Sequence, residues 1–294
     1  MSSFKSADAL DFNGGALIVT GNFKAGKTVL AHTASAFAPN PLNAKTKTTL
    51  TDLAVIQLEP NGVRSAVSLG LVAANVLDLS GPEFRRAFEA DAELTAAKGG
   101  SNELGLDFLK VMPALIKAAE HIKSHPEIKV VVFDHLTRFD AMVESHYRNP
   151  KYAPKTNRGE VDTFGIFRMV KEAHQWLAQL FFGTGVLFIG ICQVKTPAKE
   201  ADENKLAAKA IGGDNTDLVL ALPQASAGFW AGYADAVIAT RRKKTRVGTE
   251  DKTSYRMMLT SSQRFPSGNR FGLEGEHDSH LGPIIKNFYQ DLRK

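Results

Sequence analysis

Short apolar-rich runs alternate along this chain with segments in which apolar residues recur at helical spacing. Strands are expected at 16–20, 53–58, 130–133, 186–192, 234–240 and 255–259, and helices at 27–38, 108–125, 164–183 and 281–292. Pro113 lies inside the second helical pattern, so that helix should begin or kink there. The alternation predicts an α/β fold with a mainly parallel sheet, helices on both faces, a short basic C-terminal β region and a final helix.

The composition favours one globular, cytoplasmic domain. Of the 294 residues, 44% are hydrophobic, which is ample for a core. Cys192 is the single cysteine, which excludes a disulfide framework. No apolar run approaches the roughly 20 residues that span a bilayer, and the N-terminus lacks a signal-peptide pattern, so no membrane association is expected. We expect a leader over 1–14, with Phe4–Ala7 as a candidate oligomerisation segment, and one domain over 15–294.

Positive charge is concentrated near the C-terminus. Residues 241–270 contain nine Lys and Arg against Glu250 and Asp251, a local charge of +7 within a chain of net charge +5. Such a segment suggests a polyanionic partner, either nucleotide phosphates or nucleic acid. A solvated, twisted hairpin would explain the same charges without any partner.

The expected strand 16–20 is followed by the sequence GNFKAGKT, which fits the phosphate-loop pattern G-x-x-x-x-G-K-[ST]. In this pattern backbone N–H groups surround the β-phosphate, the lysine reaches the β- and γ-phosphates, and the last hydroxyl faces Mg²⁺. The pattern also stands between a strand and a helix, as its chemistry requires. The predicted nucleotide-binding residues are Gly21, Asn22, Phe23, Lys24, Ala25, Gly26, Lys27 and Thr28.

Three further polar residues stand at the ends of expected strands. Asp134 ends the run VVVFD, the usual Walker B form, and would hold Mg²⁺ together with Thr28. Glu59 could polarise an attacking water, and Gln193 could contact a γ-phosphate. Both could instead be ordinary polar residues at strand ends, and Asp134 could simply cap the following turn.

Other phosphate-loop enzymes fit less well. A GTPase should carry an N-K-x-D motif, which the chain lacks. A small-molecule kinase with 241–246 as its lid remains open, although that segment lies unusually close to the C-terminus.

The order of these motifs resembles that of RecA-like ATPases. The phosphate loop is followed by LEPNG, VVVFDHLT and LFIGICQVK, and then by LPQASAGFWAGYADAVIAT and FPSGNRFGL. From Gly14 to Leu292 the chain looks like the single-domain phage recombination proteins often called AAA family ATPases. The resemblance implies a RecA-like P-loop NTPase core that binds ATP and Mg²⁺. It also implies catalytic roles for Lys27, for Glu59 as base and for Gln193 as the link to a DNA-binding loop.

The resemblance further implies a homo-oligomer, as a ring or short filament, in which one subunit supplies a cation to its neighbour's nucleotide. The candidates are Arg241, Arg242, Lys243, Lys244, Arg264 and Arg270. The implied activity is an ATPase acting on single-stranded DNA in phage recombination, strand annealing or replication, in the host cytoplasm. A single-strand-binding protein is a further candidate partner. A ring helicase or DNA-translocating motor, and an ATP-dependent assembly module without turnover, remain alternatives.

Two segments combine features that grip single strands, namely cations and aromatic rings. The expected loop 145–162 contains Tyr147, Arg148, Lys151, Tyr152, Lys155 and Arg158, and the loop after Gln193 contains Lys195 and Lys199. A solvated surface loop would have the same composition. Both loops are expected to emerge from the strand ends, at the edge that carries the phosphate loop.

Overall fold

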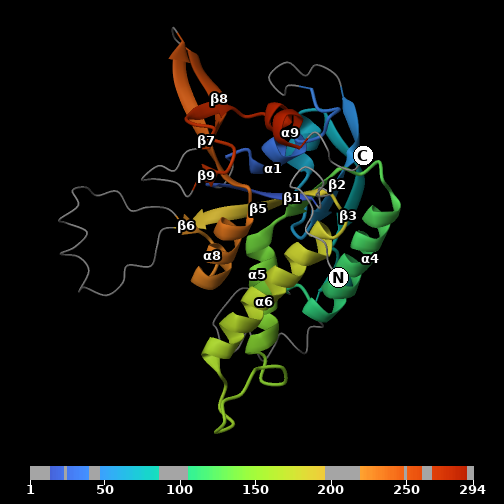
Figure 1. Ribbon diagram of the computed structural model, residues 1–294, viewed down its shortest axis with the longest axis vertical. Helices are drawn as coiled ribbons and strands as arrows, with labels where there is room; N and C mark the ends of the chain where they lie inside the picture. Colours follow the sequence, from blue (N-terminus) through green and yellow to red (C-terminus); the bar gives the residue numbers. More distant parts are fainter. Residues whose placement is uncertain are drawn as a thin grey trace, which may run out of the picture.

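The computed structural model describes residues 14–22, 25–39, 47–85, 105–195, 219–247, 250–259 and 267–289, with backbone only at 219, 244–247, 250–253 and 288. One mixed sheet crosses the molecule in the order β10-β8-β7-β1-β5-β4-β2-β3, with β6 beside β5 and β9 beside β7 (Figure 1). Its strands are β1 (Gly15–Gly21), β2 (Thr48–Gln57), β3 (Leu71–Asp78), β4 (Val130–Asp134), β5 (Leu187–Lys195), β6 (Val219–Leu220), β7 (Ala236–Val247), β8 (Glu250–Met258), β9 (Gly268–Asn269) and β10 (Glu276–Asp278).

Every pairing from β7 to β3 is parallel, whereas β6, β8, β9 and β10 pair antiparallel. The predicted α/β class with a mainly parallel sheet is therefore confirmed. Strands β1 and β4 are buried along their whole length, and β5 between them is buried over its first six residues. Strands without polar alternation require cover on both faces.

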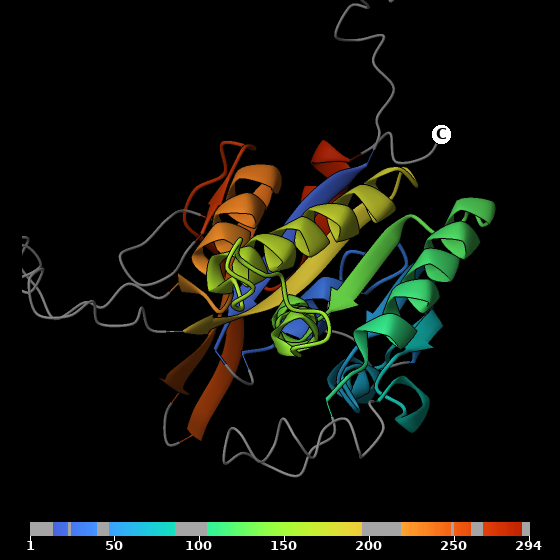
Figure 2. The same ribbon diagram turned by 90° about the horizontal axis from the view of Figure 1, so that it is seen from below.

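Helices supply that cover. They are α1 (Lys27–His32), α2 (Arg64–Ser68), the 3₁₀ helix η2 (Pro82–Phe84), α4 (Phe108–Ser124), α5 (Leu136–Arg148), α6 (Thr163–Phe182), α8 (Gln224–Tyr233) and α9 (Gly282–Phe288). Buried residues of α4, α5, α6 and α8 share one core cluster with β1 and β4, and those of α1, α2 and α9 share a second cluster. Figure 2 shows the first group lying over one face of the sheet.

The long helices begin at side-chain caps. Asp107 accepts a hydrogen bond from the Leu109 N–H at the start of α4, and Asp162 accepts one from Gly165 at the start of α6. Because the cap fixes the start at Phe108, the prediction that the helix begins at Pro113 is wrong; the proline lies inside α4. No helix in the described part of the chain is long and apolar enough to cross a membrane.

The helix expected over 27–38 ends at His32. The Asp52 carboxylate on β2 accepts hydrogen bonds from the Ser35 hydroxyl and, at 2.7 Å, from the Ala36 N–H, so the chain leaves the helical path. The final helix is also shorter than expected, ending at Phe288. The elements α5, α8 and β3 were not predicted.

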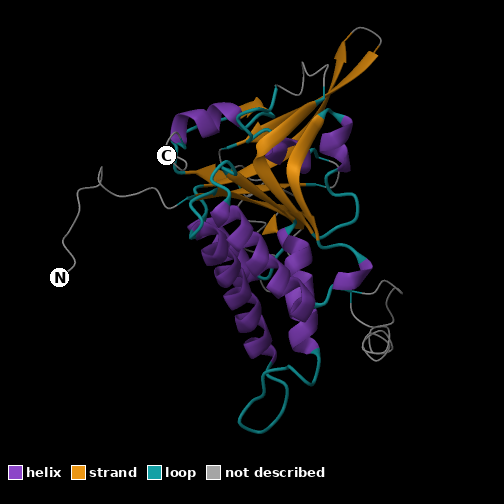
Figure 3. Ribbon diagram, turned by 90° about the vertical axis from the view of Figure 1, so that its right-hand side faces the viewer, coloured by secondary structure: helices purple, strands orange, loops and turns teal. Residues whose placement is uncertain are grey.

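The expected loop 145–162 does not emerge from a strand end, because α5 follows β4 and continues to Arg148. The remaining residues form the tip of an α5–α6 hairpin, which projects away from the sheet (Figure 3). This tip is a built turn: the Thr156 N–H donates to the Glu160 carbonyl, and Lys155 pairs with Val161 as an isolated antiparallel bridge.

Candidate functional site

The predicted phosphate loop, residues 21–28, requires glycine at positions 21 and 26 for steric reasons. Gly21 has φ +149°, and a Cβ there would lie 2.5 Å from the Thr240 Oγ1. Gly26 has φ +83°, and its Cβ would lie 3.0 Å from the Tyr255 ring. Strands β7 and β8 therefore contact the loop directly. A side chain at position 21 or 26 would displace the loop from these strands.

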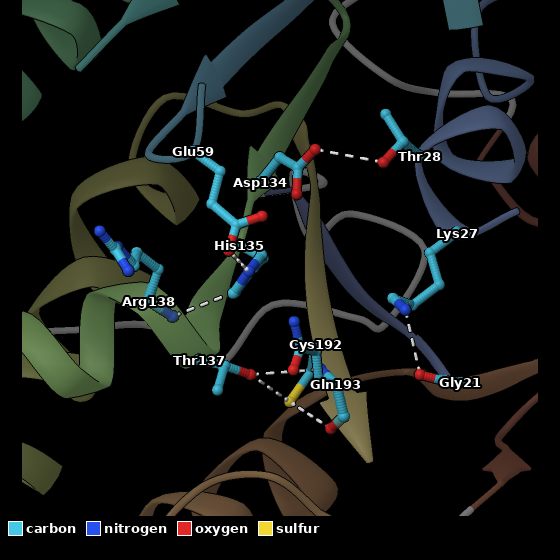
Figure 4. Close-up of polar contacts among 10 residues, drawn as sticks. All are labelled: Gly21, Lys27, Thr28, Glu59, Asp134, His135, Thr137, Arg138, Cys192 and Gln193. Atoms are coloured by element: carbon cyan, nitrogen blue, oxygen red, sulfur yellow. Dashed lines mark hydrogen bonds and ion pairs between the residues drawn. The ribbon is translucent and has the colours of Figure 1, made fainter. Parts of the chain in front are cut away.

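The Lys27 ammonium folds back over this loop. Its Nζ donates a hydrogen bond to the Gly21 carbonyl at 3.0 Å (Figure 4) and another to the Asn22 carbonyl at 2.8 Å. Burial lowers the pKa of Lys27, while the nearby Asp134 and Glu59 act in the opposite direction. The positive charge of Lys27 therefore interacts with both carboxylates. Phe23 and Lys24 lie outside the described residues.

Thr28 and Asp134 meet although they are far apart in sequence. The Thr28 hydroxyl donates to Asp134 Oδ2 at 3.2 Å, across the gap between the start of α1 and the end of β4. Burial raises the pKa of Asp134, opposed by His135, Thr28 and Lys27. Gly62 makes room for this carboxylate, since a Cβ there would lie 2.9 Å from Oδ2. This explains the glycine of the EPNG turn.

The Thr28–Asp134 pair suits Mg²⁺ chemically. Mg²⁺ prefers oxygen ligands and usually takes one or two from the protein, leaving water and phosphate oxygens to complete its shell. A hydroxyl and a carboxylate within hydrogen-bond distance of each other match that small donor set. In the described part of the chain, no three His, Cys, Asp or Glu side chains gather as a metal site.

Glu59 stands on the turn after β2 and is bound by a residue that the sequence analysis did not single out. The His135 Nε2 lies 2.7 Å from Glu59 Oε1. This hydrogen bond lowers the pKa of Glu59, against the effect of partial burial and with help from the charges of Arg138 and Lys27. Glu59 is therefore an ionised, half-exposed carboxylate close to Lys27.

Gln193 lies at the far end of β5, opposite Gly21 on β1. Its N–H donates to the Thr137 hydroxyl at 3.2 Å, which ties the strand end to the first turn of α5. Cys192 lies within 3.6 Å of the same hydroxyl, and burial raises the pKa of its thiol to about 11. The buried thiol therefore contributes to packing. Thr137, which binds the Gln193 backbone, is a second residue that the sequence alone did not indicate.

The basic candidates divide between the two faces of the β7–β8 hairpin. Arg241 and Lys243 form ion pairs with Glu276, as does Arg256 from β8. Arg242 lies opposite Tyr255, hence on the face that meets the phosphate loop.

Arg270 is held elsewhere, by the Gly232 carbonyl and by Asp235, at the amino ends of β1 and β7. The Lys244 side chain and Arg264 lie outside the described residues. Among the described candidates, only Arg241 and Lys243 therefore share a partner, whereas Arg242 and Arg270 lie elsewhere.

The DNA-binding candidates do not form one surface either. The Tyr152 ring stacks on His146 and the Tyr147 ring packs against Phe108, so neither ring is a free platform. Arg148 pairs with Glu144, and Lys151 lies 5.1 Å above the Tyr152 ring.

The exposed cations of the hairpin tip are Lys151, Lys155 and Arg158. Phe164, in the first turn of α6 and expected in its apolar pattern, is instead 89% exposed. On the other candidate loop, Lys195 donates to the Leu222 carbonyl at 2.9 Å, and Lys199 lies outside the described residues.

No protein-family model matches this chain, and no curated protein matches it. The functional conclusions below therefore depend on the residues and their geometry.

Proposed function

We propose that this protein is a RecA-like P-loop ATPase that binds ATP with Mg²⁺ and hydrolyses its β–γ phosphoanhydride bond. The observation that carries the proposal is the Thr28–Asp134 hydrogen bond beside Lys27, with Glu59 next to them. This groups a cation, a hydroxyl–carboxylate pair and an ionised carboxylate at the carboxyl ends of neighbouring parallel strands, where α/β sheets bind their ligands.

The strand order supports the role proposed for Gln193. Strand β5 lies between β1 and β4, so Gln193 stands between the phosphate loop and the strand that ends in Asp134. A side chain at that position is well placed to meet a γ-phosphate bound by the loop.

In the proposed reaction, water attacks the γ-phosphorus, the bond to the β–γ bridging oxygen breaks, and ADP leaves with inorganic phosphate. Glu59 accepts the proton of the attacking water. Lys27 exchanges its loop carbonyls for phosphate oxygens and stabilises their negative charge. When bound by Thr28 and Asp134, Mg²⁺ supplies further neutralisation of phosphate charge.

Single-stranded DNA is the proposed polymer partner, bound during phage recombination, annealing or replication. The support is the positively charged turn at the hairpin tip with the exposed Phe164, since cations and aromatic faces together bind single strands. The proposed assembly is a homo-oligomer. Directional unwinding driven by hydrolysis would instead indicate the helicase or motor alternative.

Calorimetric titration with ATP and Mg²⁺ tests the nucleotide site. Lys27→Ala should weaken ATP binding by about 10- to 100-fold, because a charged contact to the phosphates is lost. Lys117→Ala, an exposed lysine on α4, is the matched control and should bind normally. Wild-type protein that is folded but binds no ATP, or Lys27→Ala with normal affinity, would refute the proposal.

A further inference from the structure

Both nitrogens of the His135 imidazole have hydrogen-bond partners. Its Nδ1 lies 3.1 Å from the Arg138 backbone N, and its Nε2 lies 2.7 Å from Glu59 Oε1. The Arg138 N–H can only donate, so Nδ1 is the acceptor. The proton of the neutral ring therefore sits on Nε2 and is donated to Glu59.

This ring is held rigidly. His135 is the N-cap of α5 and follows directly on β4, with only 5% of the residue exposed. Glu59, by contrast, stands on a turn and its side chain is 41% exposed. A glutamate in such a place would otherwise sample several rotamers, and fixing it costs entropy.

We propose that His135 is a positioning residue that fixes one carboxylate oxygen of Glu59 and leaves the other, Oε2, to accept the proton of water. This inference rests on the proposed function. A fixed base is productive because misplacement by about 1 Å can cost a rate factor on the order of 100. The histidine directly after Asp134 thus connects the end of β4 to the turn after β2.

The decisive variant is His135→Asn. Asparagine is a good N-cap and keeps the start of α5, but its shorter amide does not replace the ring between α5 and Glu59. We expect kcat for ATP to fall by about 10- to 100-fold while KM changes by less than about threefold. His121→Asn, on an exposed histidine of α4, should leave kcat and KM unchanged.

A double-mutant cycle separates positioning from general disruption. In a Glu59→Gln background, His135→Asn should change the residual kcat by less than about twofold, because its effect passes through the carboxylate. A full additional loss in that background, or an unchanged or raised kcat in His135→Asn alone, would overturn the inference.

One measurement does not require turnover. Nitrogen-15 NMR of the imidazoles should show His135 protonated at Nε2 and unprotonated at Nδ1, with the Nε2 resonance shifted in Glu59→Gln. The opposite tautomer would overturn the inference even in an active enzyme. Absence of ATP hydrolysis by the wild-type protein would instead refute the proposed function, whatever the tautomer.

Discussion

The sheet edge that carries the proposed nucleotide site, called the nucleotide edge, and the tip of the α5–α6 hairpin differ in how their candidate residues are organised. At the edge, Lys27 and Thr28 at the start of α1 and Asp134 at the end of β4 converge: Thr28 lies within hydrogen-bond distance of Asp134, and Lys27 within hydrogen-bond distance of the loop before it. At the tip, candidates adjacent in sequence diverge: Tyr152 packs inward on His146, while Arg158 faces solvent.

This difference reflects the structures that carry the residues. Parallel strands end along one line, so polar residues that follow them must meet. At the tip, Tyr147 and Arg148 lie on the last turn of α5, where successive residues face different sides, and the other candidates lie on the connection that follows, so no common line gathers them. Motif spacing therefore predicts which residues meet at the sheet edge better than composition predicts which residues meet at the hairpin tip.

The largest expected effect is a loss of folding stability in acid, through a buried histidine on the helix that begins at the nucleotide edge. His32 on α1 is fully buried; its Nδ1 donates to the Thr28 carbonyl and Nε2 has no partner in the described residues. Burial lowers its pKa to about 4, well below the unfolded value of about 6.5. The unfolded chain thus takes up the proton first, and stability falls as the pH drops from about 6.5 towards 4.

At pH 5 this linkage should cost about 2 kcal/mol relative to pH 7, a roughly 30-fold change in the folding equilibrium. Urea unfolding at the two pH values measures it. In His32→Leu the difference between pH 7 and pH 5 should shrink by a similar amount. If His32→Leu lost as much stability between pH 7 and pH 5 as the wild type does, another group would be responsible for the acid sensitivity.

The meeting of Thr28 and Asp134 at this sheet edge could be predicted because it follows from local sequence patterns. Glycines, a lysine and a hydroxyl at fixed spacing identify the loop, and an apolar run ending in Asp134 identifies its partner. His135 and Thr137 could not be found in this way. Their partners Glu59 and Gln193 lie 76 and 56 residues away, and only the fold brings them together.

The same limit applies to the elements that were missed. Strand β3 alternates between intermediate and exposed residues, since it lies at the edge of the sheet. Helix α5 buries the polar residues Asp140 and His146, which obscures its apolar stripe. Asp140 is accommodated by a hydrogen bond with His174, a pairing that sequence alone does not reveal.

Removing the exposed ring at the tip should have the next largest effect. Phe164→Ala should weaken binding to a short oligothymidine by about 10-fold, because stacking of a base on an aromatic ring contributes on the order of 1–3 kcal/mol. Fluorescence anisotropy measures the affinity, and Phe164→Tyr should retain it. The control is Phe37→Ala, whose ring is 57% exposed in the turn after α1. Equal losses in both alanine variants would mean that the tip has no special role.

The smallest effect concerns the salt dependence of single-strand binding. It tests whether the exposed cations of the tip contact DNA phosphates while the paired Arg148 does not. Each phosphate contact on a single strand contributes about 0.7 to the slope of log K against log salt, so Lys155→Ala with Arg158→Ala should lower the slope by about 1.4. Arg148→Ala should leave it nearly unchanged, because that guanidinium is already paired with Glu144. A slope that responds to Arg148 instead would show that DNA displaces the internal ion pair, and the tip would then be organised by its ligand, unlike the nucleotide edge.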